Sequence, residues 1–141
     1  MGTYRDRNRI LAELGYSSYG EYLRSVLWAS IRSRVYAKIG RNPSCVVCRS
    51  PSEHLHHIQY SRQCLSGQSL YGIVPVCGRC HHVVEFDERK RKRTLAQAQR
   101  AYQDLKRSVR FGAIKRCKKC GAFKKGFFCR TCRAKKFRDS G

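Results

Sequence analysis

The sequence predicts a small α+β fold in which two short strands lie between helices and metal-bound cysteines supplement a small core. Three observations predict it. Eight of the nine cysteines in the 141 residues form C-x-x-C pairs, apolar residues recur at helical spacing on both sides of the middle segment, and two short apolar runs lie within it. So short a middle segment buries little core, and bound metal supplies the missing stability.

Three helices are expected before residue 41. Residues 5–14 form the first, and Ser18, followed three residues later by a glutamate, begins the second with a capping-box pattern. Ser25 caps the third helix, which runs to about Ile39, where Gly40 follows as a natural stop. Apolar positions of this third helix recur at helical spacing, so one face packs on a core. These positions are Trp28, Ile31, Val35 and Ile39.

Residues 41–85 are the compact middle of the chain. Residues 55–60 and 73–76 are the two expected strands, and a polar loop over residues 61–72 joins them. A helix is expected to begin at Cys80, soon after the second strand. The order strand, strand, helix gives this part its α+β character.

A run of five basic residues, 89–93, follows and is interpreted as a linker. Thr94 and Gln97 form a capping box that begins an amphipathic helix, and Gly112 ends it. The apolar stripe of this helix consists of Leu95, Ala98, Tyr102, Leu105 and Val109. The opposite face carries Arg100, Lys106, Arg107 and Arg110. For that face, phosphate contact and a merely solvated surface are equally good interpretations.

These patterns divide the chain into four parts. Helices that pack on the core occupy residues 1–40, and the middle domain occupies 41–88. A basic linker and amphipathic helix occupy 89–112, and a basic tail with the last cysteines, expected to be a zinc ribbon or knuckle, occupies 113–141. At this length, such parts are very small modules rather than ordinary domains.

The paired cysteines predict two structural zinc ions. The first set brackets the middle domain, with 28 residues between its pairs, and the second lies in the tail, with eight residues between its pairs. Two C-x-x-C pairs make one tetrahedral Cys₄ zinc site. The first set is Cys45, Cys48, Cys77 and Cys80, and the second is Cys117, Cys120, Cys129 and Cys132. A redox or disulfide role fits matched pairs of pairs less well.

The N-terminal residues lack the apolar core of a signal peptide. We therefore expect a cytoplasmic protein, where disulfides are rare. Cys64, which belongs to no pair, is expected to be an inert, partly buried thiol.

Charge indicates the partner. The chain has 31 Lys and Arg against 9 Asp and Glu, a net charge of +22, and residues 113–141 contain eleven basic residues and one acid. Such an excess attracts nucleic acid, because phosphate binding releases counterions. No apolar run is long enough to span a bilayer. The expected partner is double-stranded DNA rather than a membrane, and the protein is expected to be a monomer or homodimer.

Basic side chains from the linker and the tail are the candidate phosphate contacts. They are Arg89, Lys90, Arg91, Lys92, Arg93, Lys118, Lys119, Lys124, Lys125, Arg130, Arg133, Lys135 and Lys136. Phosphate contacts give affinity without sequence preference. The sequence therefore predicts binding to nucleic acid but no target sequence.

All five histidines lie inside the segment bounded by the first cysteine set or on the helix that follows it. His81 and Glu85 are four residues apart, so on a helix they share one face and can grip one cation. His56 and His57 are adjacent on a strand, so their side chains diverge, and one can bind metal while the other faces substrate. A histidine has the right pKa to accept a proton from water near neutral pH.

Three motifs occur in order over the middle domain: C-V-V-C, L-H-H-I-Q-Y and I-V-P-V-C-G-R-C-H-H-V-V-E-F. With the helix before them, they resemble the HNH endonucleases of bacteria and phages, in the subgroup with a Cys₄ zinc. The resemblance covers roughly residues 19–90. It implies a ββα-metal finger that cuts, and most simply nicks, DNA phosphodiester bonds.

The resemblance also implies roles for individual residues. His57 is the general base that activates water, and a catalytic Mg²⁺ or Mn²⁺ is held by His56, His81 and Glu85. The family's last ligand is usually His or Asn, and Glu85 suits these two metals. The family's central Asn aligns near Gly72, so either another group does its work or catalysis is weakened.

Other interpretations remain for the domain and for two histidines. The missing Asn favours a zinc protein that binds DNA or RNA on an inactive HNH scaffold, and a purely structural zinc module fits the charge least well. His82 is expected to be exposed or to contact phosphate. His54 is expected on the surface or beside a metal ligand.

Overall fold

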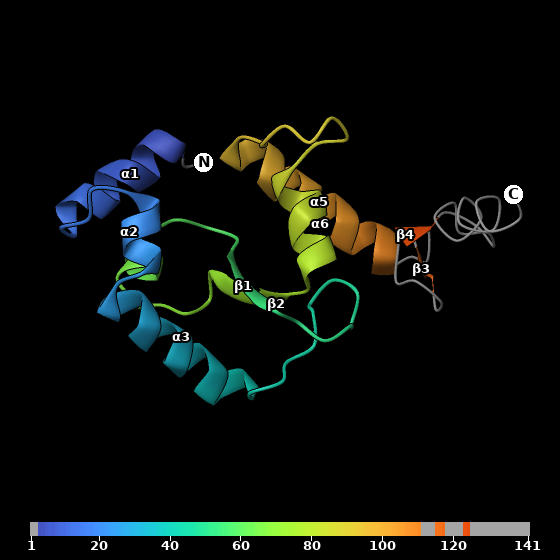
Figure 1. Ribbon diagram of the computed structural model, residues 1–141, viewed down its shortest axis with the longest axis horizontal. Coiled ribbons are helices and arrows are strands. Elements are labelled where there is room, and N and C mark those ends of the chain that lie inside the picture. The colour runs from blue at the N-terminus through green and yellow to red at the C-terminus, as the bar shows by residue number, and fades with distance from the viewer. Residues whose placement is uncertain (1–2, 111–114, 118–122, 125–141) are drawn as a thin grey trace, which may run out of the picture.

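A computed structural model describes residues 3–110, 115–117 and 123–124 of the chain. The helices are α1 (Tyr4–Glu13), α2 (Tyr19–Leu23), α3 (Val26–Ile39), α4 (Arg62–Leu65), α5 (Gly78–Glu85) and α6 (Leu95–Arg110). The strands are β1 (His54–His57), β2 (Ile73–Val76), β3 (Lys115–Arg116) and β4 (Phe123–Lys124). Each of the pairs β1–β2 and β3–β4 forms a two-stranded antiparallel sheet (Figure 1). The expected small α+β architecture is confirmed.

The β1–β2 sheet is the centre of the described fold. In its register, His56 lies opposite Val74 and His57 opposite Ile73. Figure 1 shows the sheet between the N-terminal helices and the pair α5 and α6. Side chains alternate along a strand, so β1 directs Leu55 and His57 toward one set of helices and His56 toward the other.

Two separate hydrophobic clusters result. We call the first the aromatic core, and its buried residues are Leu11, Tyr22, Trp28, Ile31, Val35, Cys64, Leu65 and Ile73. We call the second the cysteine core, and its buried residues are Cys45, Val47, Val76, Cys77, Cys80, Val84, Ala98, Tyr102 and Leu105. The aromatic core lies among α1, α2, α3 and α4, and the cysteine core lies among β2, α5 and α6.

Serine hydroxyls cap α2 and α3 as the sequence predicts. The Ser18 hydroxyl accepts a hydrogen bond from the backbone N–H of residue 21 at 3.1 Å, and the Ser25 hydroxyl accepts one from that of Trp28 at 3.1 Å. The Glu21 carboxylate accepts from the Ser17 N–H at 2.7 Å rather than closing the expected capping box at Ser18. Gly40 ends α3 at φ +90°, a conformation that residues with a Cβ rarely adopt. On α3 the predicted apolar face is buried, except that Ile39 in the last turn is 38% exposed.

Two elements begin or end two or more residues away from the expected position, and the first helix is shifted by one residue. The strand predicted over 55–60 is β1, which ends at His57 because Ser61 caps the short helix α4 inside the predicted loop. The helix predicted to begin at Cys80 begins at Gly78, because the Cys77 sulfur accepts a hydrogen bond from the Cys80 backbone N–H at 3.4 Å. A sulfur atom therefore acts as the N-cap.

The basic run 89–93 is a folded turn rather than an extended linker. The Asp87 carboxylate accepts hydrogen bonds from the backbone N–H groups of Arg89 and Arg91, both at 2.9 Å. A β-bridge joins Phe86 to Lys92. The turn thus returns the chain beside the end of α5 and directs it into α6.

The amphipathic helix is confirmed as α6. Thr94 and Gln97 exchange the two hydrogen bonds of a capping box, at 2.9 and 3.3 Å. Four residues of its predicted stripe are buried, and the fifth packs against the cysteine core. Over the part of the chain that the structure describes, no helix is both long enough and apolar enough to cross a membrane.

Candidate metal centres and active site

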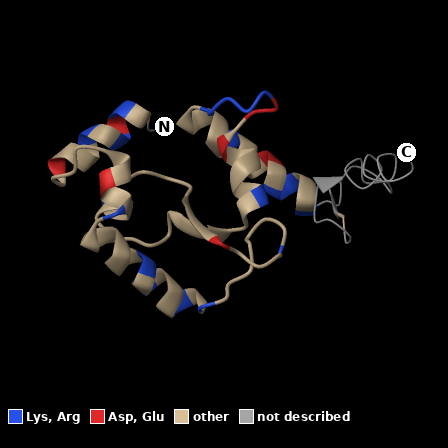
Figure 2. Cartoon of the chain, in the orientation of Figure 1, with Lys and Arg blue, Asp and Glu red and all other residues tan. Residues whose placement is uncertain are grey.

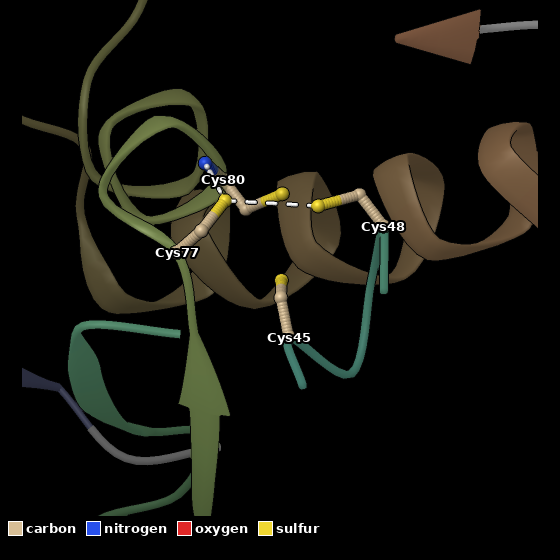
Figure 3. A group of neighbouring side chains, drawn as sticks. All are labelled: Cys45, Cys48, Cys77 and Cys80. Carbon is tan, nitrogen blue, oxygen red and sulfur yellow. Dashed lines mark hydrogen bonds between the residues drawn. The ribbon is translucent and has the colours of Figure 1, made fainter. Parts of the chain in front are cut away.

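The first cysteine set forms one compact group. Its four sulfur atoms all lie within 4.8 Å of one another, and Figure 3 shows them converging from the loop at Cys45 and Cys48 and from the junction of β2 with α5. The loop turns tightly because the Cys45 carbonyl accepts a hydrogen bond from the Arg49 N–H at 2.9 Å, with Arg49 at φ +63°. Four convergent thiols are the donor set of a structural Zn²⁺ site.

The surroundings of these sulfurs suit metal binding. Cys45, Cys77 and Cys80 are buried, and Cys48 is partly buried with its sulfur 3.7 Å from that of Cys77. A hydrogen bond from the Cys80 side chain lowers the pKa of Cys45, and the same bond raises the pKa of Cys80. The group fits a zinc ion by donor number, chemistry and burial.

Only one ligand of the predicted second zinc site is described. Cys117 is buried and follows β3. The other three, Cys120, Cys129 and Cys132, lie outside the described residues. The same holds for the predicted phosphate contacts Lys118, Lys119, Lys125, Arg130, Arg133, Lys135 and Lys136, and Lys124 is the last residue of β4. The second zinc ion stays a prediction.

A second group of metal-binding side chains joins β1 to α5. Atoms of His56, His81 and Glu85 that can bind metal all lie within 4.8 Å of one another. His56 Nδ1 lies 3.5 Å from Glu85 Oε1, and the ring centroids of His56 and His81 are 5.2 Å apart. The structure therefore brings together the three residues that the sequence predicts as ligands of one divalent cation.

Burial sets the protonation state of this group. Burial lowers the pKa of His56 to about 3 and also lowers the pKa of His81. Burial raises the pKa of Glu85. Neutral imidazole is the metal-binding form, so both rings can offer a nitrogen lone pair. Two imidazoles and one carboxylate suit a divalent metal ion.

His57 lies in a different environment. Its ring packs against Trp28 at 4.8 Å between centroids and stacks on Tyr60 at 5.3 Å. Its Nδ1 lies 3.0 Å from the Tyr19 hydroxyl oxygen, while its Nε2 is buried with no hydrogen-bond partner among the described residues. Burial lowers the pKa of His57 to about 4. The imidazole is therefore neutral near pH 7, and its burial makes it a weaker base than a free histidine.

Two clefts meet at these histidines. One, of about 360 Å³, lies between the N-terminal helices and α5, and the other, of about 420 Å³, lies between β1 and α6. The residues that line both clefts are His56, His57, Tyr60 and Glu85. Three cationic residues, Arg7, Arg32 and Lys92, line the first cleft. A phosphate entering this cleft would meet positive charge beside the candidate metal ligands.

The sequence alone indicated no role in this site for Arg7, Tyr19 or Tyr60. Arg7 on α1 places its guanidinium carbon 4.2 Å from the ring centroid of Tyr19 and 5.6 Å from that of Tyr60. Such contacts hold a cation over an aromatic face. Arg7 and Tyr19 lie on separate helices far from His57 in the sequence, so no local pattern predicts that they meet it. The several tyrosines in and around α2 were the one sign in the sequence of an aromatic cluster.

The surroundings of Gly72 leave no space for the Asn that the resemblance places near this position. The Gly72 carbonyl accepts a hydrogen bond from the Ile58 N–H at 2.8 Å. A Cβ atom at residue 72 would lie 2.6 Å from Gln59 Cγ and 2.7 Å from Cys64 Sγ. There is no room for an Asn side chain at this position. Cys64 itself is fully rather than partly buried, and burial raises its pKa to about 11, as expected of an inert thiol.

The remaining histidines are placed as predicted. His54 is exposed and stacks on His81, with centroids 5.2 Å apart, so it lies beside a candidate ligand. His82 is exposed and stacks on Phe86.

Most side chains of the basic run are accessible. Figure 2 shows Lys and Arg on α1, on α3 and in the loop between α5 and α6. Arg89, Lys90, Arg91 and Lys92 are exposed, although Arg91 pairs with Asp87 at 2.8 Å. Arg93 is only partly exposed, and its carbonyl accepts a hydrogen bond from the Tyr4 hydroxyl. Arg93 is therefore the weakest of these candidates for phosphate contact.

The chain was compared with protein-family models, curated proteins and solved structures. None of the three comparisons finds a match. The function of the site is therefore inferred from its own geometry and chemistry.

Proposed function

We propose that the protein is a metal-dependent endonuclease of the HNH type that nicks DNA. The observation that carries the proposal is the convergence of His56, His81 and Glu85, whose metal-binding atoms lie within 4.8 Å of one another, with His57 next to His56 in the chain. The resemblance of the motifs assigned these same residues. Their meeting in space supports that assignment, because His56 comes from β1 and His81, 25 residues later, comes from α5.

The three residues would hold a divalent cation such as Mg²⁺ or Mn²⁺. Such a cation stabilises negative charge on the scissile phosphate and on the leaving oxygen. The side chains are held ready for it, because His56 and His81 are neutral imidazoles and the Glu85 carboxylate lies within 3.5 Å of His56. The cysteine group would hold a separate, structural Zn²⁺.

His57 would take the proton of the attacking water. Its imidazole is neutral, and Nε2 is not engaged by any described group. Arg7, Arg32 and Lys92 line the same cleft and would bind the phosphates on either side of the cut. The net charge of +22 would bring the protein to DNA.

A plasmid-nicking assay tests the proposal. Supercoiled plasmid is incubated with the full-length, zinc-loaded protein and with Mg²⁺, Mn²⁺ or no added divalent cation. We expect nicking only with the cation, and we expect His57→Ala to slow it by about 100-fold or more, as loss of a general base does. His82→Ala is the matched control, because His82 is exposed and lies outside the metal group. Cleavage by His57→Ala at the rate of His82→Ala would refute the proposed role.

A non-enzymatic DNA- or RNA-binding protein is the second candidate. Two observations favour it: His57 is only 3% exposed, and no asparagine occurs in residues 61–76. This candidate predicts tight, salt-dependent binding without cleavage in any divalent metal. The same assay, with a gel-shift measurement beside it, separates the two functions.

A further inference from the structure

The contact between Tyr19 and His57 joins two parts of the chain that are 38 residues apart. The Tyr19 hydroxyl oxygen lies 3.0 Å from His57 Nδ1, and it comes from α2, outside the β1–β2–α5 unit. Tyr19 is held in place by stacking on Tyr22, with centroids 6.0 Å apart, and by the Arg7 guanidinium over its ring. A residue fixed in this way can fix the orientation of the ring to which it bonds.

The direction of this hydrogen bond decides what His57 can do. A neutral imidazole carries one N–H and one lone pair. If Nδ1–H donates to Tyr19, the lone pair is on the buried Nε2 and is available to take a proton. If Tyr19 donates instead, Nε2 carries the N–H and has no lone pair with which to take a proton. Nε2 has no partner among the described residues in either case, so it is the proposed function that requires the first direction.

Tyr60 lies against both groups. Its ring stacks on His57 with centroids 5.3 Å apart, and it meets the Tyr19 ring edge-on with centroids 5.8 Å apart. The rings of Tyr19 and Tyr60 therefore both pack on His57 and restrict the rotation of the imidazole.

The Tyr19 contact is the hydrogen bond that the fold offers to this ring. Residue 72, where the resemblance places the family's asparagine, has no space for a side chain, since a Cβ there would lie 2.7 Å from Cys64 Sγ. Among the described side chains, Tyr19 is the one within hydrogen-bonding distance of the His57 ring.

We propose that Tyr19 is the positioning residue of the active site, whose hydroxyl accepts a hydrogen bond from His57 Nδ1–H and so keeps the Nε2 lone pair ready for the attacking water. This inference rests on the proposed function for its catalytic consequence, but its structural part does not. An N-terminal helix thereby supplies a part of the catalytic apparatus to the ββα unit.

The test compares Tyr19→Phe with Tyr22→Phe in the full-length, metal-loaded protein. Both tyrosines lie against His57, with ring centroids 6.0 and 6.2 Å from it. The Tyr22 hydroxyl, however, is buried with no hydrogen-bond partner among the described groups. Each variant therefore removes one tyrosine hydroxyl from the same cluster of rings, but only Tyr19→Phe removes the proposed hydrogen bond to His57.

The first readout is the tautomer of His57, from long-range ¹H–¹⁵N NMR correlations of histidine-labelled protein. We expect a protonated Nδ1 and an unprotonated Nε2 in the wild type and in Tyr22→Phe, and a mixture of tautomers in Tyr19→Phe. The second readout is nicking kinetics. We expect Tyr19→Phe to lower kcat by about 10- to 100-fold, the range typical of lost orienting hydrogen bonds to histidine, with KM unchanged and with Tyr22→Phe as active as the wild type.

Two results would overturn the inference. One is an Nε2–H tautomer in the wild type, and the other is equal kcat for Tyr19→Phe and Tyr22→Phe. If the wild type nicks no DNA, the proposed function fails, while the NMR comparison still decides whether Tyr19 sets the tautomer. Circular dichroism of both variants shows whether a loss of activity comes from unfolding.

Discussion

The two cores of this protein lie on opposite sides of one small sheet and differ in composition. The cysteine core surrounds four sulfurs within 4.8 Å of one another. The aromatic core has no such group among the described residues and depends on packing of rings and aliphatic side chains, with Tyr22 and Leu11 fully buried. A metal ion held by the four sulfurs would add strong, directional bonds to the cysteine core, whereas packing accumulates from many weak contacts.

Strand β1 contributes one histidine to each side of the sheet. His56 and His57 are consecutive in β1, so they point to opposite faces. His56 meets the candidate metal ligands of α5, and His57 meets the aromatic rings of the N-terminal helices. The candidate ligand and the candidate base therefore have different surroundings, although the two residues are adjacent in the chain.

The largest effect is expected from breaking the cysteine core. Cys45→Ser removes one of four sulfurs, and we expect the free energy of unfolding to fall by about 4 kcal/mol or more, as losses of structural metal do. The zinc content should fall by one equivalent per chain. Urea titration followed by circular dichroism, with elemental analysis for zinc, measures both quantities.

Cys64→Ala is the control for this change. Cys64 is buried in the aromatic core and lies outside the sulfur group. The substitution Cys64→Ala should leave the zinc content unchanged. Full zinc content in Cys45→Ser would contradict the assignment of this site.

An intermediate effect is expected from breaking the aromatic core. Leu11 is fully buried, and Leu11→Ala should lower the free energy of unfolding by about 2 to 5 kcal/mol. Leu23, on α2, is 38% exposed, so Leu23→Ala should cost less than about 1 kcal/mol. The emission of the single tryptophan, Trp28, which lies in this core, follows both transitions. Loss of zinc from folded Leu11→Ala would show that the two cores are not separately held.

The smallest effect is expected from a substitution in the cleft between the N-terminal helices and α5. Arg7→Gln removes one cation from the cleft beside His56. If Arg7 contacts one phosphate, the slope of log affinity for double-stranded DNA against log salt should shrink by about 1. Fluorescence anisotropy with a labelled duplex measures this slope. Arg41→Gln, at an exposed residue outside both clefts, should leave the slope unchanged, and equal slopes for the two variants would remove Arg7 from the interface.

Local patterns predicted most of the described secondary structure. The caps at Ser18, Ser25 and Thr94 and the stripe of α6 all follow from contacts within one helix. The start of α5 was misplaced because a cysteine sulfur serves as its cap, which composition rules for caps do not include. The run of basic residues at 89–93 does not predict its turn, because the turn depends on hydrogen bonds from the backbone N–H groups of Arg89 and Arg91 to the Asp87 carboxylate.

The sequence by itself determined the metal-binding groups. C-x-x-C pairs and the i, i+4 spacing of His81 and Glu85 fix which side chains can share an ion, because ligand geometry is short-range and nearly invariant. Only the tertiary structure decided which residues surround His57. Tyr19 and Arg7 reach it through the packing of separate helices, and the space at Gly72 is closed by Cys64 and Gln59. Such contacts depend on how helices cross over a sheet, and no local period of the chain encodes that.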